Sequence, residues 1–186
     1  MTPRSVKPAP RSALLIVDMI NPLDFPGAPA LLRQSIPVAT RIERLKLRMK
    51  SRGQPAIYVN DNFSHWLRDF HELVAICSEP RAAGAALAAT LAPEHDDYLV
   101  LKPKHSGFFA SPLEVLLAQL DIRHVVVTGI AGDGCVLATA TDAHMHDLEV
   151  SVPSDCCASI SKARNDRALR LLRESMKIDT RLSRYL

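Results

Sequence analysis

Three residues whose side chains could together carry out nucleophilic catalysis stand at the ends of apolar segments. Asp18 follows the apolar residues 13–17, Lys102 follows residues 98–101, and Cys135 follows a glycine-rich segment. A thiol can attack a carbonyl carbon, a carboxylate can take the thiol proton, and an ammonium group can hold an anion in place. Each residue alone also fits a structural role: a capping aspartate, a solvated lysine and a small core cysteine. Together they supply a nucleophile, a base and a cation, provided that the fold brings them to one place.

The segment around Cys135 favours an activated thiol. Residues 128–136 read TGIAGDGCV, and their three glycines allow a tight backbone path and the close approach of a ligand. The cysteine then opens a predicted helix. The free N–H groups and the positive dipole end of a helix N-terminus lower the pKa of a thiol and can hold a developing oxyanion. We therefore expect Cys135 to be the nucleophile, with a lowered pKa.

The elements that must position these residues alternate along the chain. Short apolar segments typical of strands buried on both faces are residues 13–17, 56–59, 98–101, 125–128 and 148–152. Helices are predicted for residues 36–50, 81–91, 112–120, 135–146 and 162–175, and a capping box of Ser111 and Glu114 begins the third of them. This alternation predicts one α/β domain with a parallel sheet. Because ligands bind beyond the carboxyl ends of parallel strands, Asp18, Lys102 and Cys135 are expected at one edge of the sheet.

Length and composition exclude several classes of protein. The chain has 186 residues, of which 47% are hydrophobic and 23% charged, an ordinary globular mixture. We expect a single domain over residues 12–186, preceded by a flexible, proline-containing arm, residues 1–11. No segment approaches the roughly 18 apolar residues of a membrane span. The net charge of +3 is too small to indicate a nucleic-acid-binding face, so we expect neither a membrane nor a nucleic-acid partner.

The cysteines indicate a reducing compartment. Cys77, Cys135, Cys156 and Cys157 form no CxxC pair, and the adjacent Cys156 and Cys157 cannot easily pair with each other. The apolar segment that follows the basic arm has five residues, whereas a secretory signal needs about 7–15. We therefore expect free thiols and a cytoplasmic protein.

Four motifs, in order, resemble the isochorismatase-like cysteine hydrolase superfamily, in its branch related to nicotinamidase and N-carbamoylsarcosine amidase. They lie between residues 12 and 159: residues 14–21 (LLIVDMIN) with Phe25, Lys102 with residues 106–108 (SGF), residues 127–130 (VTGI) with residues 135–136 (CV), and residues 139–143 (TATDA) with residues 154–155 (SD). The resemblance implies a three-layer α/β/α fold with a Rossmann-like, six-stranded parallel sheet. Its sixth strand would lie near residues 178–181.

The resemblance also implies a mechanism that needs no cofactor. Asp18, Lys102 and Cys135 would form a catalytic triad in which Cys135 attacks an amide-like carbonyl and forms a thioester that water then hydrolyses. A cis peptide bond between Ile130 and Ala131 would direct the N–H groups of Ala131 and Cys135 at the oxyanion. The implied substrate is a small amide, ureide or carbamoyl compound, and the implied assembly is a homodimer or homotetramer.

The metal site of nicotinamidases is incomplete in this sequence. Their Asp-x-His motif after the second strand corresponds to Asp61, Asn62 and Phe63, so a phenylalanine replaces the histidine. Asp61 and His65, with His71 downstream, do not complete a ligand set. We therefore expect no metal, and a nicotinamidase-like amidase with a degenerate metal site stays an alternative.

Two further alternatives stay open. One is a non-catalytic member of the fold that serves binding or assembly, and the other is a redox-sensing protein that uses Cys156 and Cys157. For the substrate contacts of an enzyme we expect Phe25, Asn62, Trp66 and Phe108, although core packing is the ordinary role of such aromatic residues.

Overall fold

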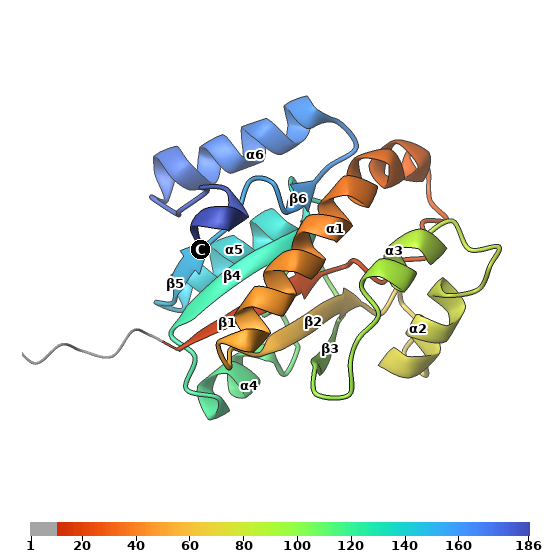
Figure 1. The fold of residues 1–186 in the computed structure, drawn as a ribbon, viewed down its shortest axis with the longest axis horizontal. Coiled ribbons are helices and arrows are strands. Elements are labelled where there is room, and N and C mark those ends of the chain that lie inside the picture. Colours follow the sequence, from red (N-terminus) through yellow and green to blue (C-terminus); the bar gives the residue numbers. More distant parts are fainter. Residues whose placement is uncertain (1–10) are drawn as a thin grey trace, which may run out of the picture.

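Helices cover both faces of a β-sheet in the computed structural model, which describes residues 11–186 (Figure 1). The strands are β1 (Ser12–Val17), β2 (Ala56–Asp61), β3 (Tyr98–Lys102), β4 (His124–Ile130), β5 (Glu149–Ser151) and β6 (Cys157–Ala158). The helices are α1 (Ala28–Ser51), α2 (Phe70–Cys77), α3 (Ala85–Thr90), α4 (Leu113–Gln119), α5 (Cys135–Met145) and α6 (Lys162–Ser175), and the chain ends in a 3₁₀ turn, η1 (Ser183–Tyr185). Residues 1–10 of the predicted arm lie outside the described residues.

All strands of the sheet run parallel, in the order β3-β2-β1-β4-β5. The sixth strand, β6, pairs with Gly129 and Ile130 at the carboxyl end of β4, whereas β5 pairs with residues 124–126 at its other end. The predicted α/β fold with a six-stranded parallel sheet is confirmed. Within the described part of the chain, every helix is too short or too polar to cross a membrane.

The strands carry apolar residues on both faces because each face supports its own core. On β1, Leu14 and Ile16 pack with buried residues of α1, α2 and α3. Leu15 and Val17, which point to the opposite face, pack with buried residues of α4, α5 and α6. This two-sided burial explains why the strand segments show no polar alternation in the sequence.

The sixth strand is not where the resemblance placed it. Residues 178–181 form no strand, and Asp179 makes only an isolated bridge with Ser151. The carbonyl of Asp179 accepts a hydrogen bond from the N–H of Val152 at 2.7 Å. Because β5 ends at Ser151, it offers residues 178–181 too little edge for a longer pairing.

The helix predictions differ from the structure at four places, one of which is the helix predicted for residues 81–91, which forms only over Ala85–Thr90. The first helix begins at Ala28 rather than Ile36 and contains Pro37 in its interior. The sequence pattern predicts no helix at residues 70–77, where α2 is held by a capping box of Asp69 and Glu72. The predicted capping box at Ser111 is wrong, because Ser111 Oγ accepts from the N–H of Leu113 and donates to a loop carbonyl instead.

Gly129 lets β4 pass close to the end of β1. It has φ +114°, and a Cβ atom built on it would lie 2.0 Å from the carbonyl oxygen of Val17. Val17 directly precedes Asp18, and Gly129 pairs with Val17 in the sheet register. The absence of a side chain at Gly129 therefore lets the end of β4 lie close to the end of β1, which Asp18 follows.

We expect Gly129→Ala to lower the free energy of unfolding by about 3 kcal/mol, because the new methyl group collides with backbone. Urea unfolding followed by circular dichroism measures this. Gly53→Ala is the matched control, since Gly53 has φ +72° and a Cβ atom at this position would have no neighbour within 4 Å. It should cost only about 1 kcal/mol of backbone strain. Equal losses for the two variants would contradict the close approach as the cause.

Candidate active site

Four chemically active side chains meet at one edge of the sheet. Three of them stand at the carboxyl ends of adjacent strands, and the fourth is at the start of a helix. Asp18 follows β1, Asp61 and Lys102 are the last residues of β2 and β3, and Cys135 is the first residue of α5. The sheet register pairs Asp61 directly with Lys102. Because β1 lies between β2 and β4, the loop from β4 to α5 brings Cys135 to the same edge. The structure thus places Asp18, Lys102 and Cys135 together, as the sequence pattern predicts.

Lys102 is the centre of this cluster. Its side chain has 0% exposure, and its Nζ lies 2.9 Å from Asp18 Oδ2. It also donates hydrogen bonds to the carbonyl of Lys104 at 3.0 Å and to Cys135 Sγ at 3.6 Å. The charge of the nearby Asp18 carboxyl also acts on the Cys135 thiol. A base, a cation and a thiol are therefore gathered in a buried site.

Asp61 is a fourth member, which the sequence pattern suggests only as a metal ligand. Its N–H donates to Asp18 Oδ1 at 2.7 Å, and its Oδ2 lies 3.6 Å from Lys102 Nζ. Its side chain is 28% exposed, so it borders the site rather than lying under it. The sequence signal for Asp61 is its place two residues after the second predicted strand, just as Asp18 and Lys102 follow the first and third.

Burial dominates the pKa of the Asp18 carboxyl, whereas neighbouring acidic groups together outweigh burial at Lys102. Burial raises the pKa of the Asp18 carboxyl above its ordinary value, and the charge of Lys102 with hydrogen bonds from its neighbours offsets only part of this. Burial alone would lower the pKa of Lys102, but the charges of Asp18, Cys135 and Asp61 outweigh it and raise the pKa. Lys102 therefore keeps its proton, and Asp18 is a stronger base than an exposed aspartate.

The resting thiol is not activated in the way the helix position suggests. Burial, followed by the nearby charge of Asp18, raises the pKa of Cys135 to about 12, and Lys102 lowers it by less. The expectation of a lowered thiol pKa is therefore wrong. The pKa-lowering effect of the helix N-terminus is outweighed, because the sulfur is largely buried and lies near a carboxylate. At neutral pH the site holds a protonated thiol beside a base.

The loop from β4 to α5 presents backbone donors near the sulfur. The Ile130–Ala131 peptide bond is cis, at the position that the resemblance implied. The carbonyl of Ala131 accepts from the N–H groups of Gly134 and Val136, at 2.9 and 3.1 Å. The N–H of Cys135 lies between them in sequence and, as the first of α5, has no acceptor within the helix.

The predicted substrate-contact residues fall into two groups. Asn62 lies at the edge of the site, where its N–H donates to the carbonyl of Lys102 at 3.0 Å. Phe25 and Trp66 are exposed, and within residues 11–186 no hydrogen bond or ring contact joins either of them to the triad.

Phe108 is the exception among these predictions. It is buried in the core, and its ring stacks on His146 with a centroid distance of 4.9 Å. His146 follows the last residue of α5, about 16 Å along that helix from Cys135. Its side chain thus packs in the core with residues of α4 and α5, and its contact with substrate stays a prediction.

A cluster of metal-ligating side chains lies away from the triad. In the described chain, the group whose ligand atoms are close enough to hold an ion is Glu94, Asp96 and Asp97, and it does not include Asp61, His65 or His71. Lys46 and Lys50 form ion pairs with this acidic group. The acidic group is thus part of an ion-pair network that extends from the surface to the buried pair of Lys46 and Asp97.

Comparison with known proteins agrees with this architecture. The family model described as "Isochorismatase domain" matches residues 12–180. An uncharacterized isochorismatase family protein of Bacillus subtilis (strain 168), YaaI, is 38% identical over 160 residues, which cover 86% of this chain and 87% of that protein.

Solved structures share the fold. An isochorismatase family protein from Desulfovibrio vulgaris subsp. vulgaris str. Hildenborough has a TM-score of 0.77 at 22% identity, with 95% of this chain and 96% of that chain covered. N-carbamoylsarcosine amidase from Thermoplasma acidophilum has a TM-score of 0.68 at 22% identity, with 93% and 96% covered. With most of its length matched by the family model and by a relative of 38% identity, the chain belongs to the isochorismatase family and has the isochorismatase-like hydrolase fold.

Proposed function

We propose that this protein is a metal-independent cysteine hydrolase that cleaves a C–N bond of a small amide, ureide or carbamoyl compound. One observation carries the proposal: Lys102 Nζ lies 2.9 Å from the Asp18 carboxylate and 3.6 Å from the Cys135 sulfur, so one buried cation joins the carboxylate to the thiol. A thiol beside a buried base and a fixed cation is the arrangement that acyl transfer requires. The structural likeness to an N-carbamoylsarcosine amidase supports the substrate class.

In the proposed reaction, proton transfer and nucleophilic attack occur together. The thiol pKa of about 12 makes a free thiolate rare at neutral pH, so Asp18 takes the proton as sulfur attacks the carbonyl carbon. The C–N bond then breaks, and Asp18 returns the proton to the departing nitrogen. A thioester remains on Cys135. Water adds to it with Asp18 as base, and the C–S bond breaks to give the acid product and the thiol.

Backbone N–H groups are the proposed stabilisers of the tetrahedral intermediate. The Cys135 N–H opens α5, and the Ala131 N–H belongs to the cis peptide that precedes it in the loop. Fixed N–H donors aimed at a developing oxyanion commonly contribute about 3–4 kcal/mol of transition-state stabilisation. Lys102 is the proposed electrostatic anchor, since it holds Asp18 and faces the sulfur throughout.

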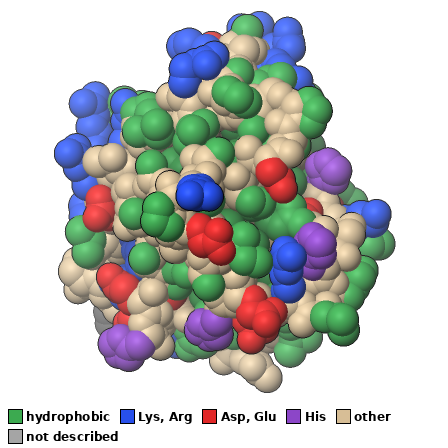
Figure 2. All heavy atoms as spheres, turned by 90° about the vertical axis from the view of Figure 1, so that its right-hand side faces the viewer, with side chains coloured by type: hydrophobic (Ala, Val, Ile, Leu, Met, Phe, Trp, Pro, Cys, Tyr) green, Lys and Arg blue, Asp and Glu red, His purple; other side chains and the backbone are tan. Residues whose placement is uncertain are grey.

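Substrate contacts are proposed for Asn62, Phe25 and Trp66. Asn62 is in direct backbone contact with Lys102, whereas Trp66 and its neighbour Leu67 are exposed apolar residues on the loop that follows β2. On the side of the molecule that carries α2 and α3, apolar side chains are mixed with charged groups and histidines (Figure 2). Exposed apolar groups in this region fit the proposed homodimer or homotetramer, in which a neighbouring subunit would cover them.

The central experiment compares turnover of the wild type and Cys135→Ala. A panel of small amides, ureides and carbamoyl compounds is screened by ammonia or amine release, before and after dialysis against a chelator. We expect Cys135→Ala to lose turnover by about 10³-fold or more while keeping its circular dichroism spectrum, because no group replaces the sulfur nucleophile. Chelator treatment should leave the wild type unchanged.

Cys77→Ala is the matched control, because it removes a buried thiol from α2, away from the site. It should retain turnover per folded molecule. Full turnover in purified Cys135→Ala would contradict the proposed nucleophile, and loss of activity on chelation would contradict metal independence.

Asp61→Asn tests the fourth member of the cluster as a positioning residue. The change removes one of two carboxylates that face Lys102 but keeps the oxygen that accepts from the Phe63 N–H. Lys102 then acts on Asp18 alone, which lowers the Asp18 pKa and weakens the base. We expect turnover to fall roughly tenfold, and the acidic limb of the pH–rate profile to move to lower pH.

The control for this change is Asp121→Asn, the same substitution at an exposed surface aspartate. It should leave both the rate and the pH profile unchanged. A lower rate in Asp61→Asn with an unmoved acidic limb would indicate a merely structural role for Asp61, and would overturn this assignment.

A further inference from the structure

The loop of residues 131–134, which joins β4 to α5, contains one charged side chain that the proposed reaction does not use. This side chain is Asp133, and the residue on each side of it is a glycine. The loop therefore has few side chains of its own with which to hold its conformation. The two proposed oxyanion donors, the N–H groups of Ala131 and Cys135, lie at the start of this loop and directly after it. Whatever holds the loop thus determines where these N–H groups point.

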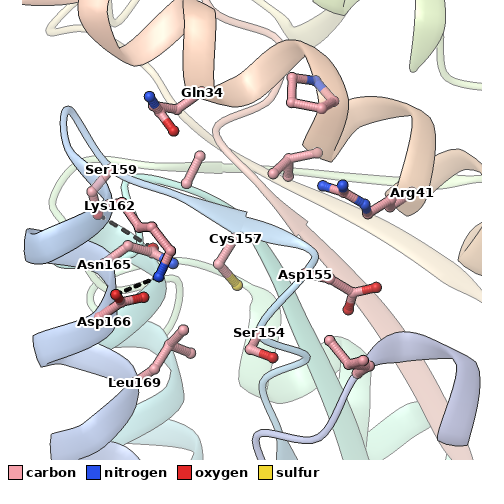
Figure 3. Close-up of a pocket in the computed structure, with 14 residues that line it drawn as sticks. Gln34, Arg41, Ser154, Asp155, Cys157, Ser159, Lys162, Asn165, Asp166 and Leu169 are labelled. Atoms are coloured by element: carbon pink, nitrogen blue, oxygen red, sulfur yellow. Dashed lines mark hydrogen bonds and ion pairs between the residues drawn. The ribbon is translucent and has the colours of Figure 1, made fainter.

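The backbone of the loop is bound to the segment that follows β6. The N–H of Gly132 donates to the carbonyl of Ala158 at 2.7 Å, and the N–H of Asp133 donates to Ser159 Oγ at 3.1 Å. Ser159 Oγ donates in turn to Asn165 Oδ1 at 3.4 Å (Figure 3). A Cβ atom on Gly132 would lie 2.0 Å from Asn165 Oδ1, so the loop packs closely on the first turn of α6.

The carboxylate of Asp133 makes a further contact with α6. Its Oδ2 accepts a hydrogen bond from Arg164 Nε at 2.5 Å. The Asp133 side chain is 16% exposed and the Arg164 side chain 47%, so the ion pair is partly shielded from solvent. Burial alone would raise the pKa of Asp133, but hydrogen bonds from Ser159 and Arg164, together with the Arg164 charge, outweigh it and lower the pKa. Asp133 is therefore an anion that is held at its N–H group and at its carboxylate.

The start of α6 gives an independent reason for this pair. Its first residues include Lys162 and Arg164, and its first turn has no acidic residue. The positive end of the helix dipole disfavours cations at this position and favours an anion. Asp133 lies 31 residues before Arg164 in the chain and brings a carboxylate to this end of the helix. The ion pair thus offsets an unfavourable charge on α6 and ties α6 to the loop.

We propose that Asp133 and Arg164 are positioning residues, whose ion pair fixes the loop of residues 131–134 and so directs the N–H groups of Ala131 and Cys135 at the oxyanion. The use of these N–H groups rests on the proposed function. Within residues 11–186, no hydrogen bond or ion pair joins the side chain of Asp133 or Arg164 to the triad, so the pair acts through the backbone. Its loss should weaken transition-state stabilisation and leave substrate binding largely unchanged.

Turnover of Asp133→Asn, Arg164→Gln and the double variant tests this role. We expect kcat per folded molecule to fall roughly tenfold in each single variant while KM stays nearly unchanged. This loss is smaller than that for removal of an oxyanion donor, because the N–H groups are still present but less well directed. Both changes break the same interaction, so the double variant should be no slower than the slower single variant. The substrate is the compound that the wild type cleaves best in the panel of small amides, ureides and carbamoyl compounds.

Hydrogen exchange of the full chain reports on the loop without any substrate. The amides of Gly132 and Gly134 donate to the carbonyls of Ala158 and Ala131, at 2.7 and 2.9 Å. We expect both amides to exchange roughly tenfold faster in Arg164→Gln than in the wild type, because loss of the ion pair makes local opening of the loop easier. Arg164→Gln is the informative variant here, since it leaves the sequence of the loop unchanged.

The neighbouring ion pair of α6 is the matched control. Lys162 and Asp166 form an ion pair at 2.6 Å on the same helix (Figure 3), and in the described chain neither has a hydrogen bond or ion pair with the loop. Lys162→Gln and Asp166→Asn therefore repeat the two substitutions without touching the loop. Both should keep the wild-type kcat and the wild-type exchange rates.

Several results would overturn the proposal. Unchanged exchange of the loop amides in Arg164→Gln would show that the ion pair does not hold the loop. Faster exchange with an unchanged kcat would indicate a merely structural role, and a raised KM in Asp133→Asn alone would indicate direct contact with substrate. Equal losses in the control variants would indicate a general effect of charge on α6. If the wild type cleaved no compound of the panel, the proposed function would fail, and the exchange rates alone would decide whether the pair holds the loop.

Discussion

A fully buried lysine is the constraint on which this site depends. Lys102 has no exposed side-chain surface, and an unpaired ammonium in such a place would be expensive to bury. Asp18 and Asp61, from the ends of two neighbouring strands, supply the compensating charges at 2.9 and 3.6 Å. Removing one partner of a buried ion pair commonly costs about 3–5 kcal/mol, so this cluster ties the ends of β1, β2 and β3 to one another.

The same constraint shapes the chemistry that we propose. A buried carboxylate next to the sulfur raises the pKa of Cys135, so the resting enzyme avoids a free thiolate, which would be prone to oxidation. The raised pKa of Asp18 makes that carboxylate a better proton acceptor at the moment of attack. The positive charge of Lys102 offsets the negative charge of the cluster while the proton moves between Cys135 and Asp18. Reactivity would then develop only when a carbonyl carbon is in place.

The sequence is sufficient to predict the sheet and the convergence of the triad. Each triad residue follows an apolar strand or begins a helix, and parallel strands must end at one edge. The raised pKa of Cys135 could not be predicted, because helix position is a local feature whereas desolvation and the Asp18 charge arise from tertiary contacts. The contact of Asp61 with Lys102 depends on the register of β2 with β3, which no local pattern specifies. The burial of Phe108 could not be predicted either, because the sequence does not say on which side of the sheet its loop packs.

Two short elements of the fold could not be predicted from a pattern along the chain. Helix α2 has only two turns, so its apolar periodicity is too short to distinguish from a loop. The two residues of β6 are recognisable only by their pairing with Gly129 and Ile130.

Control of the Cys135 thiol by the buried carboxylate is tested most directly by the rate at which iodoacetamide alkylates this cysteine. The rate is resolved by peptide mass spectrometry across a range of pH that includes the ordinary thiol pKa of 9.0, and the pH at which it rises reports the thiol pKa. We expect slow alkylation of the wild type at pH 9.0, because the thiol pKa is raised to about 12. Asp18→Asn should move the rise to lower pH, since it removes the carboxylate that raises this pKa, and Lys102→Met should move it to higher pH. If the wild-type rate rose well below pH 9.0, or if Asp18→Asn moved the rise to higher pH, the buried carboxylate would not raise the thiol pKa.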